Sequence, residues 1–235
     1  MKTPENSPQN WETVEAPLVN RLERLHLDTR QKAEILYVKA GLKPASWIKF
    51  DTSMNIPSDN PEPVEFYTEE DIQEYYDFLK QLNLPFKILP RKIMPETQRI
   101  SGVKTEIARH QVETAVAHSP DDLDKLLMAI PNMDHEKLGL ALGYPPTAVK
   151  AFAENKGRAN LYKLPKEVLL SDAFIFSHTL TYSEDNWQNE IQDGLRNAEF
   201  LKTVSPQIYN QIKEKADVLY KSMGVLDDKT RGKFE

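Results

Sequence analysis

The stretch that organises this sequence is residues 134–157, Asp-His-Glu-Lys-Leu-Gly-Leu-Ala-Leu-Gly-Tyr-Pro-Pro-Thr-Ala-Val-Lys-Ala-Phe-Ala-Glu-Asn-Lys-Gly. Asp134 can cap a helix, because its carboxylate accepts hydrogen bonds from first-turn amides that lack a partner. Gly143 can end that helix, since glycine adopts a left-handed conformation at little cost. Pro146 has the fixed φ that suits the first position of a second helix. The stretch therefore predicts two short helices joined by a corner.

Each of these two helices carries one apolar stripe at helical spacing. The stripe of the first helix is Leu138, Ala141 and Leu142, and that of the second is Ala148, Val149, Phe152 and Ala153. We expect the stripes to face each other, so that Val149 and Phe152 are buried against Leu138 and Leu142.

Length and composition set limits on the class of protein. The chain has 235 residues, of which 40% are hydrophobic and 28% charged, as in ordinary globular proteins. A net charge of -6 argues against a broad nucleic-acid or anionic-membrane surface, although a local basic patch remains compatible with it. The absence of cysteine excludes disulfides, thiolate metal sites and cysteine nucleophiles. With neither a signal-peptide pattern nor a stretch of ~20 apolar residues, a soluble cytoplasmic protein is expected.

The rest of the chain predicts further helices and a few strands. Helix signals are the leucine spacing at 18–25 and the capping residues Asp28, Thr68, Ser119, Ser183 and Ser205. Strands are expected over 46–51, 86–89 and 173–182, where aromatic and β-branched residues gather. Residues 106–118 fit a helix as well as a strand, and their alternation favours a strand.

Together these elements predict an α+β fold that is predominantly helical. It would have a small mixed β-sheet, a central helix-corner-helix and a C-terminal helical pair. The expected divisions are a flexible tail at 1–16, an α+β core domain at 17–164, a strand plus helical hairpin packed on it at 165–224, and a charged tail at 225–235.

Two segments resemble a family of uncharacterised bacterial proteins, a domain of unknown function. One is Lys39-Ala-Gly-Leu-Lys-Pro-Ala-Ser46, and the other is His135-Glu136 followed by Leu142-Gly-Tyr-Pro145, Val149, Phe152 and Glu154-Asn-Lys-Gly157. The resemblance covers residues 36–157. Beyond Arg158 the family usually continues with a cysteine-containing segment, and this chain has no cysteine. The resemblance therefore implies a bacterial protein in which these two segments occur in this order, and it implies no catalytic or binding function.

A binding or regulatory protein without catalytic activity is the function that this sequence favours, because no convergent polar motif is readable from it. The expected contact surface surrounds residues 144–158, with the candidate binding residues Tyr144, Thr147, Lys150, Lys156 and Arg158. Its partner would be a protein or a small ligand. No cofactor is expected.

Two alternatives stay open. Residues 134–157 have the outline of a helix-turn-helix, whose outward lysines could meet phosphates of a nucleic acid. An enzyme could instead use a histidine and carboxylate site, for which the candidates are His110, His118, His135 and Glu136. No metal is expected at these residues, because no spacing matches a pattern such as His-Glu-x-x-His, and neighbouring helical positions point to different sides.

Overall fold

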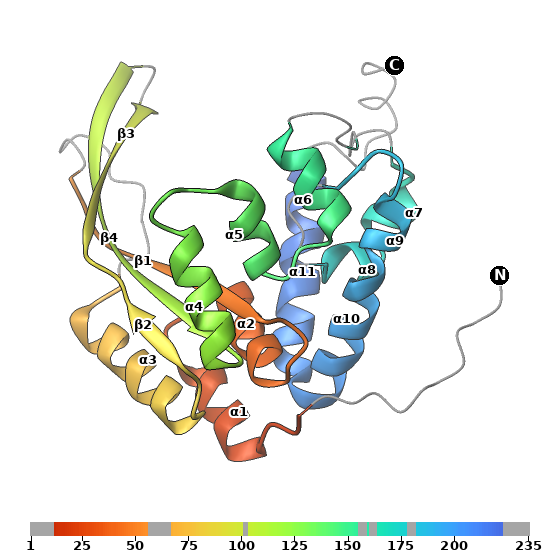
Figure 1. Cartoon of the computed structure of the whole chain (residues 1–235), viewed down its shortest axis with the longest axis horizontal. Helices are drawn as coiled ribbons and strands as arrows, with labels where there is room; N and C mark the ends of the chain where they lie inside the picture. The colour runs from red at the N-terminus through yellow and green to blue at the C-terminus, as the bar shows by residue number, and fades with distance from the viewer. Residues whose placement is uncertain are drawn as a thin grey trace.

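The computed structural model describes residues 12–55, 67–100, 103–154, 159, 164–177 and 182–222. Its fold is α+β and predominantly helical, as expected, with a small sheet that has helices on both faces (Figure 1). All pairings between the described strands are antiparallel, so the expected mixed sheet is wrong. None of the described helices has the length and apolarity needed to cross a membrane.

The sheet is built around one long strand. This strand, β4 (Val103–Ala117), pairs along one side with β1 (Ala45–Asn55) and along the other with β2 (Phe86–Ile88) and β3 (Lys92–Ile100). The alternation of residues 106–118 therefore does mark a strand. The hairpin of β3 and β4 extends beyond the helices (Figure 1). Strand β1 forms one edge of the sheet, and this position matters for the site described below.

One face of the sheet packs against α1 (Ala16–Arg24), α2 (Thr29–Lys39) and α3 (Glu69–Gln81). Asp28 caps α2 and Thr68 caps α3, as the sequence predicts, and both caps are part of capping boxes. The buried residues of this layer include Leu36, Phe50, Tyr75, Phe78 and Val116. Aromatic rings make close contacts here, with the Phe50 and Tyr75 centroids 5.0 Å apart.

The other face packs against α4 (Pro120–Ala129) and α5 (His135–Ala141). The sheet presents Ala45, Ala115 and Ala117 on this side, and these small residues leave room for Leu126 and Leu138. Helix α6 (Pro146–Ala153) follows α5 after the predicted corner. The Asp134 carboxylate accepts from the Lys137 amide at 3.1 Å, and Gly143 has a φ of +79°.

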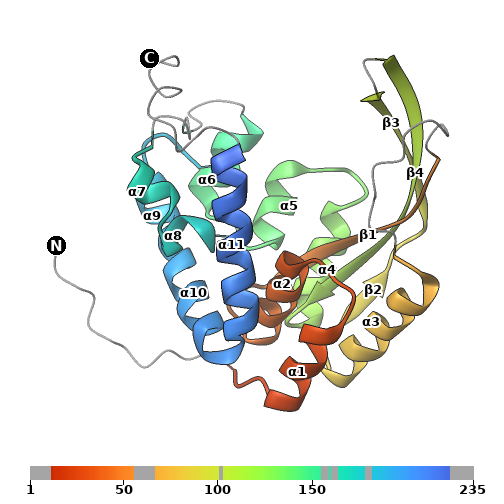
Figure 2. The ribbon, with the colours of Figure 1, turned by 180° about the vertical axis from the view of Figure 1, so that it is seen from behind.

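The C-terminal part contains α7 (Lys166–Leu169), α8 (Asp172–Ile175), α9 (Trp187–Glu190), α10 (Gln192–Val204) and α11 (Pro206–Ser222). Helix α11 lies beside α2, which Figure 2 shows from behind. Phe200, Leu201, Ile208 and Ile212 belong to the same buried cluster as residues of α1, α2 and α3. The C-terminal helices therefore share a core with the N-terminal ones.

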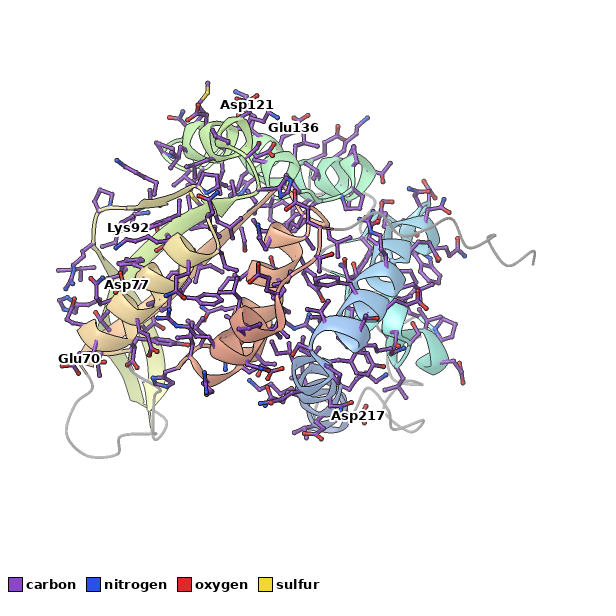
Figure 3. All side chains as sticks on the ribbon, turned by 90° about the horizontal axis from the view of Figure 1, so that it is seen from below. Glu70, Asp77, Lys92, Asp121, Glu136 and Asp217 are labelled. Carbon is purple, nitrogen blue, oxygen red and sulfur yellow. The ribbon has the colours of Figure 1, made fainter. Side chains whose placement is uncertain are left out.

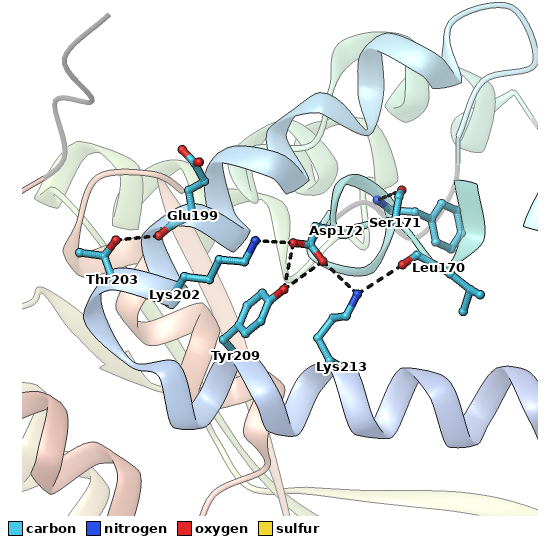
Figure 4. A network of polar contacts seen from close by, with 9 residues as sticks. Leu170, Ser171, Asp172, Glu199, Lys202, Thr203, Tyr209 and Lys213 are labelled. Atoms are coloured by element: carbon cyan, nitrogen blue, oxygen red, sulfur yellow. Dashed lines mark hydrogen bonds and ion pairs between the residues drawn. The ribbon is translucent and has the colours of Figure 1, made fainter. Parts of the chain in front are cut away.

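Asp172 holds three of these helices together (Figure 4). Its carboxylate accepts from Lys202 Nζ at 2.7 Å on α10, and from Tyr209 Oη at 2.9 Å and Lys213 Nζ at 2.9 Å on α11. Burial raises the pKa of the Asp172 carboxyl, but the hydrogen bonds from Lys202, Lys213 and Tyr209 outweigh it and hold that pKa below its ordinary value.

Several local expectations are wrong. Residues 172–175 form α8 where a strand over 173–182 was expected, because the Ser171 hydroxyl caps a helical turn by accepting from the Phe174 amide. Residues 178–181 of that stretch lie outside the described residues. Asn186, not Ser183, precedes α9, and β3 was not predicted. Phe152 is 38% exposed, whereas Leu138, Leu142 and Val149 are buried as expected.

Candidate ligand-binding site

A cavity of about 630 Å³ lies between α2, β1 and the corner formed by α5 and α6. Residues of α8 and Tyr182 complete its wall. Pockets that bind small molecules usually have volumes of about 300–1,000 Å³ and apolar linings with a few polar groups. The cavity has both properties, as its lining residues show.

The corner supplies the apolar wall. Leu138, Leu142, Ala148 and Val149 line the cavity from the stripes that also hold α5 against α6. Gly139 is required between them, because a Cβ at this position would fall 2.7 Å from a Val149 methyl group. Phe152, His135 and Tyr144 add rings to the same wall, with the His135 and Phe152 centroids 5.3 Å apart.

The opposite wall is the outer edge of β1. Ser46, Trp47, Ile48 and Lys49 all line the cavity. Successive side chains of a strand point to opposite faces of its sheet, so a cavity on one face would contact alternate residues. Four consecutive lining residues therefore indicate that the cavity lies beside the edge of the strand.

One end of this wall carries a buried ion pair. Lys43 Nζ binds the Glu34 carboxylate, which also accepts from Ser46 Oγ at 3.0 Å. The side chain of Lys43 is only 3% exposed, so the paired carboxylate compensates for its lost hydration. Lys43 Nζ also lies 5.6 Å from the centroid of the Tyr144 ring. This end of the cavity is polar and electrically compensated.

The other end is cationic. Arg30 lines it, and its guanidinium forms no ion pair or hydrogen bond with any residue that the structure describes. Lys49 Nζ lies over the Trp47 ring, 3.9 Å from its centroid, and 3.8 Å from the Glu113 carboxylate. Lys92 binds the same carboxylate at 2.9 Å, so two ammonium groups share one negative charge. The end near Arg30 and Lys49 therefore favours an anion.

Of the candidate binding residues of 144–158, the structure describes Tyr144, Thr147 and Lys150, and their side chains point to different surroundings. Tyr144 is partly buried and lines the cavity. Its burial, and to a smaller extent the negative charge of Glu34, raises the pKa of its hydroxyl to about 12. The Thr147 hydroxyl donates to Glu190 at 2.6 Å. Lys150 is exposed, 3.9 Å from Glu154. Lys156 and Arg158 lie outside the described residues.

Three of the four polar candidates for an enzyme lie away from the cavity. His110 lies within β4 and His118 just beyond its end, so roughly 27 Å of strand separates them. His118 Nδ1 lies 3.0 Å from the Val38 carbonyl oxygen. Glu136 is exposed on the outside of α5 (Figure 3), and only His135 reaches the cavity. Within the described ranges, no group of three or more histidine, aspartate or glutamate side chains is placed to hold a metal ion.

Sequence reasoning missed most of the cavity's polar residues. Arg30, Glu34, Lys43 and Trp47 were not among the candidates, although all four line it. The spacing of Arg30 and Glu34, four residues apart on α2, places them on one helical face and is the one signal that could have grouped two of them. Nothing in the sequence connects that face with the corner about a hundred residues later.

The fold and this cavity define a predominantly helical α+β protein with a partly apolar, partly cationic pocket beside a sheet edge. No protein-family model matches the chain, and comparisons with curated proteins and with solved structures also give no match.

Proposed function

We propose that this chain is a binding protein whose ligand is an apolar molecule carrying a negatively charged group. The observation that carries the proposal is the asymmetry of the cavity: Leu138, Leu142 and Val149 line one wall, and Arg30 lies toward Lys49, because its neighbour Gln31 donates to the Lys49 carbonyl at 2.8 Å. Burying apolar surface would supply affinity, at about 25 cal/mol per Å². The cations would orient the ligand and favour acids over neutral molecules.

The contact surface expected around residues 144–158 keeps part of its role in this proposal. Tyr144 would contact the ligand from the inner side of the corner. Thr147 would instead hold the corner in place, because its hydroxyl is occupied by Glu190 and accepts from Asn186 Nδ2 at 3.1 Å.

Decanoate is a suitable probe, because it joins a flexible apolar chain to one carboxylate. We expect it to bind the full chain in isothermal titration calorimetry and to displace anilinonaphthalene sulfonate. Arg30→Glu should weaken decanoate binding about tenfold, the effect of ~1.4 kcal/mol. Arg24→Glu is the matched control, since Arg24 is also exposed but does not line the cavity.

The proposal fails if neither decanoate nor anilinonaphthalene sulfonate binds the protein at millimolar concentration. It fails equally if Arg30→Glu and Arg24→Glu bind decanoate with the same affinity as the unchanged chain.

A further inference from the structure

The backbone groups on the outer edge of β1 can be assigned from the pairing of β4. Leu89 donates to the Glu113 carbonyl at 2.9 Å and Ala117 donates to the Pro85 carbonyl at 3.0 Å, so the odd-numbered residues of this part of β4 face β2. Its even-numbered residues then face β1, where Thr114 pairs with Ile48 and Val116 with Ser46. It follows that the backbone amide and carbonyl groups of Trp47 and Lys49 point away from β4, toward the outer edge of the sheet.

Two contacts confirm this assignment and limit the open part of the edge. Gln31 Nε2 donates to the Lys49 carbonyl at 2.8 Å, and the Tyr67 amide donates to the Asp51 carbonyl at 3.1 Å. The Trp47 N–H, the Trp47 carbonyl and the Lys49 N–H have no hydrogen-bond partner in the part of the chain that the structure describes. Three consecutive ladder groups are thus left open beside the cavity.

We propose that the ligand is the C-terminal segment of a peptide, which adds to β1 as a parallel strand. This inference rests on the proposed function and specifies the chemistry of its ligand. An unpaired strand edge is a template for an extended chain, whose backbone supplies hydrogen bonds while pockets take alternate side chains.

The direction of the peptide follows from the charges. Gln31 contacts Lys49 and Glu34 contacts Ser46, so Arg30 lies toward the Lys49 end of the open edge. A terminal carboxylate directed to Arg30 makes the peptide run parallel to β1. At the opposite end the Glu34 charge is already compensated by Lys43, so a second acidic group has no cation to meet there.

Three hydrogen bonds then span the last three peptide residues, and they are made by the first and the last of the three. The Trp47 N–H donates to the carbonyl of the third residue from the C-terminus, and the N–H of the last residue donates to the Trp47 carbonyl. The Lys49 N–H donates to the terminal carboxylate, which also meets Arg30. Gln31 occupies the next group, the Lys49 carbonyl, so the pairing ends where the peptide ends. Leu138, Leu142 and Val149 would receive an apolar side chain.

Proline at position 49 tests the backbone contact directly. Proline removes an N–H and is tolerated on strand edges, and the Lys49 N–H takes no part in the ladder with β4. Lys49→Ala is the matched control, because it removes the same side chain and keeps the N–H. The probe is a synthetic library of acetylated tetrapeptides with free C-terminal carboxylates, compared with the same library as C-terminal amides.

We expect library acids to bind the full chain and their amides to bind at least tenfold more weakly, since the amide loses the charge that meets Arg30. Lys49→Pro should weaken binding of the selected acids about tenfold relative to Lys49→Ala, the loss of one charge-assisted hydrogen bond. Decanoate should bind these two variants equally well. In the unchanged chain, hydrogen exchange at the Trp47 and Lys49 amides should slow when a selected peptide is added, whatever the fold of the proline variant.

Equal binding of acids and amides, or unchanged exchange at both amides, would overturn the peptide assignment. Binding of decanoate without binding of any library member would overturn it too, while leaving the proposed function in place. If neither decanoate nor any peptide binds, both the assignment and the proposed function are wrong.

Discussion

Gly143 lies directly against Pro44. A Cβ built on Gly143 would fall 2.5 Å from the Pro44 Cδ atom, and the φ of Gly143 is +79°. This contact joins the corner between α5 and α6 to the turn that leads into β1. The two main walls of the cavity are therefore held together where the Gly143 backbone meets the Pro44 ring, and no larger side chain fits between them.

Gly143→Ala should consequently lower the free energy of unfolding by about 1–3 kcal/mol, from left-handed backbone strain together with the overlap with Pro44. Urea unfolding followed by circular dichroism measures this change. Leu140→Ala is the control, because Leu140 on α5 is 45% exposed and its truncation should cost less than about 0.5 kcal/mol. Equal stability of the two variants would contradict the close contact.

Glu190 should be necessary for the position of the corner. It is 2% exposed, and its carboxylate accepts from the Thr147 hydroxyl at 2.6 Å, the Ser183 amide at 2.8 Å and the Ser183 hydroxyl at 2.5 Å. Glu190→Ala leaves these donors without an acceptor and should cost about 2–3 kcal/mol of stability. Thr147→Ala removes only one donor and should cost less.

A double-mutant cycle separates the contribution of the Thr147–Glu190 hydrogen bond from that of the other hydrogen bonds of Glu190. If Thr147 and Glu190 interact as described, the cost of the double variant falls short of the sum of the single costs by about 0.5–3 kcal/mol. Strict additivity, measured by urea unfolding, would show that the bond does not stabilise the protein.

Asp172 should make the free energy of unfolding depend on pH in the acid range. Its pKa is held below the ordinary value of 3.8, because hydrogen bonds from Lys202, Lys213 and Tyr209 outweigh the effect of burial. A depressed folded-state pKa means that the unfolded chain binds the proton more readily. The stabilisation is therefore complete above the unfolded pKa and is lost as the pH falls through the folded one.

Asp172→Asn should accordingly cost about 1–2 kcal/mol at pH 7, a figure reduced for the solvent screening of Lys202, which is 47% exposed. The difference in unfolding free energy between this variant and the unchanged chain should shrink below about pH 4. Urea unfolding at a series of pH values from 7 to about 3 tests this expectation. A constant difference across that range would show that the carboxylate charge is not responsible.

Removing one charge of the Glu34–Lys43 ion pair should destabilise the protein more than removing both charges. Glu34→Gln leaves the ammonium of Lys43, which is 3% exposed, without its countercharge and should cost about 2–3 kcal/mol. The double variant Glu34→Gln with Lys43→Met removes both charges and should recover much of that loss. Thermal and urea unfolding of both variants measure it, and a double variant less stable than Glu34→Gln would contradict this account.

Local signals in the sequence were sufficient for much of the fold. The caps at Asp28, Thr68 and Asp134 and the left-handed Gly143 were all predicted and are present. Each depends on interactions within a few residues of chain, so the residue types alone specify it. The strand predicted over 173–182 is wrong where the structure forms α8, up to Ile175. Aromatic content is a weak guide to strand formation, because tertiary packing overrides it.

The candidate site depended on contacts far apart in the chain. Arg30 on α2, Trp47 on β1 and Val149 on α6 come together only because β1 lies at the edge of the sheet and Gly143 seats the corner against Pro44. Phe152 shows the same limit, since helical spacing placed it on the apolar stripe but could not tell that it would remain 38% exposed beside a cavity.

By itself the sequence determined where most helices begin, where the chain turns between α5 and α6, and which residues alternate along β4, because these are short-range consequences of hydrogen bonding and periodicity. Only the tertiary structure decided that β1 lies at an edge of the sheet, that the Arg30 guanidinium beside it has no partner among the described residues, and that Tyr144 lines the cavity. Those outcomes depend on how separate segments share space and solvent, and no local pattern of residues encodes that.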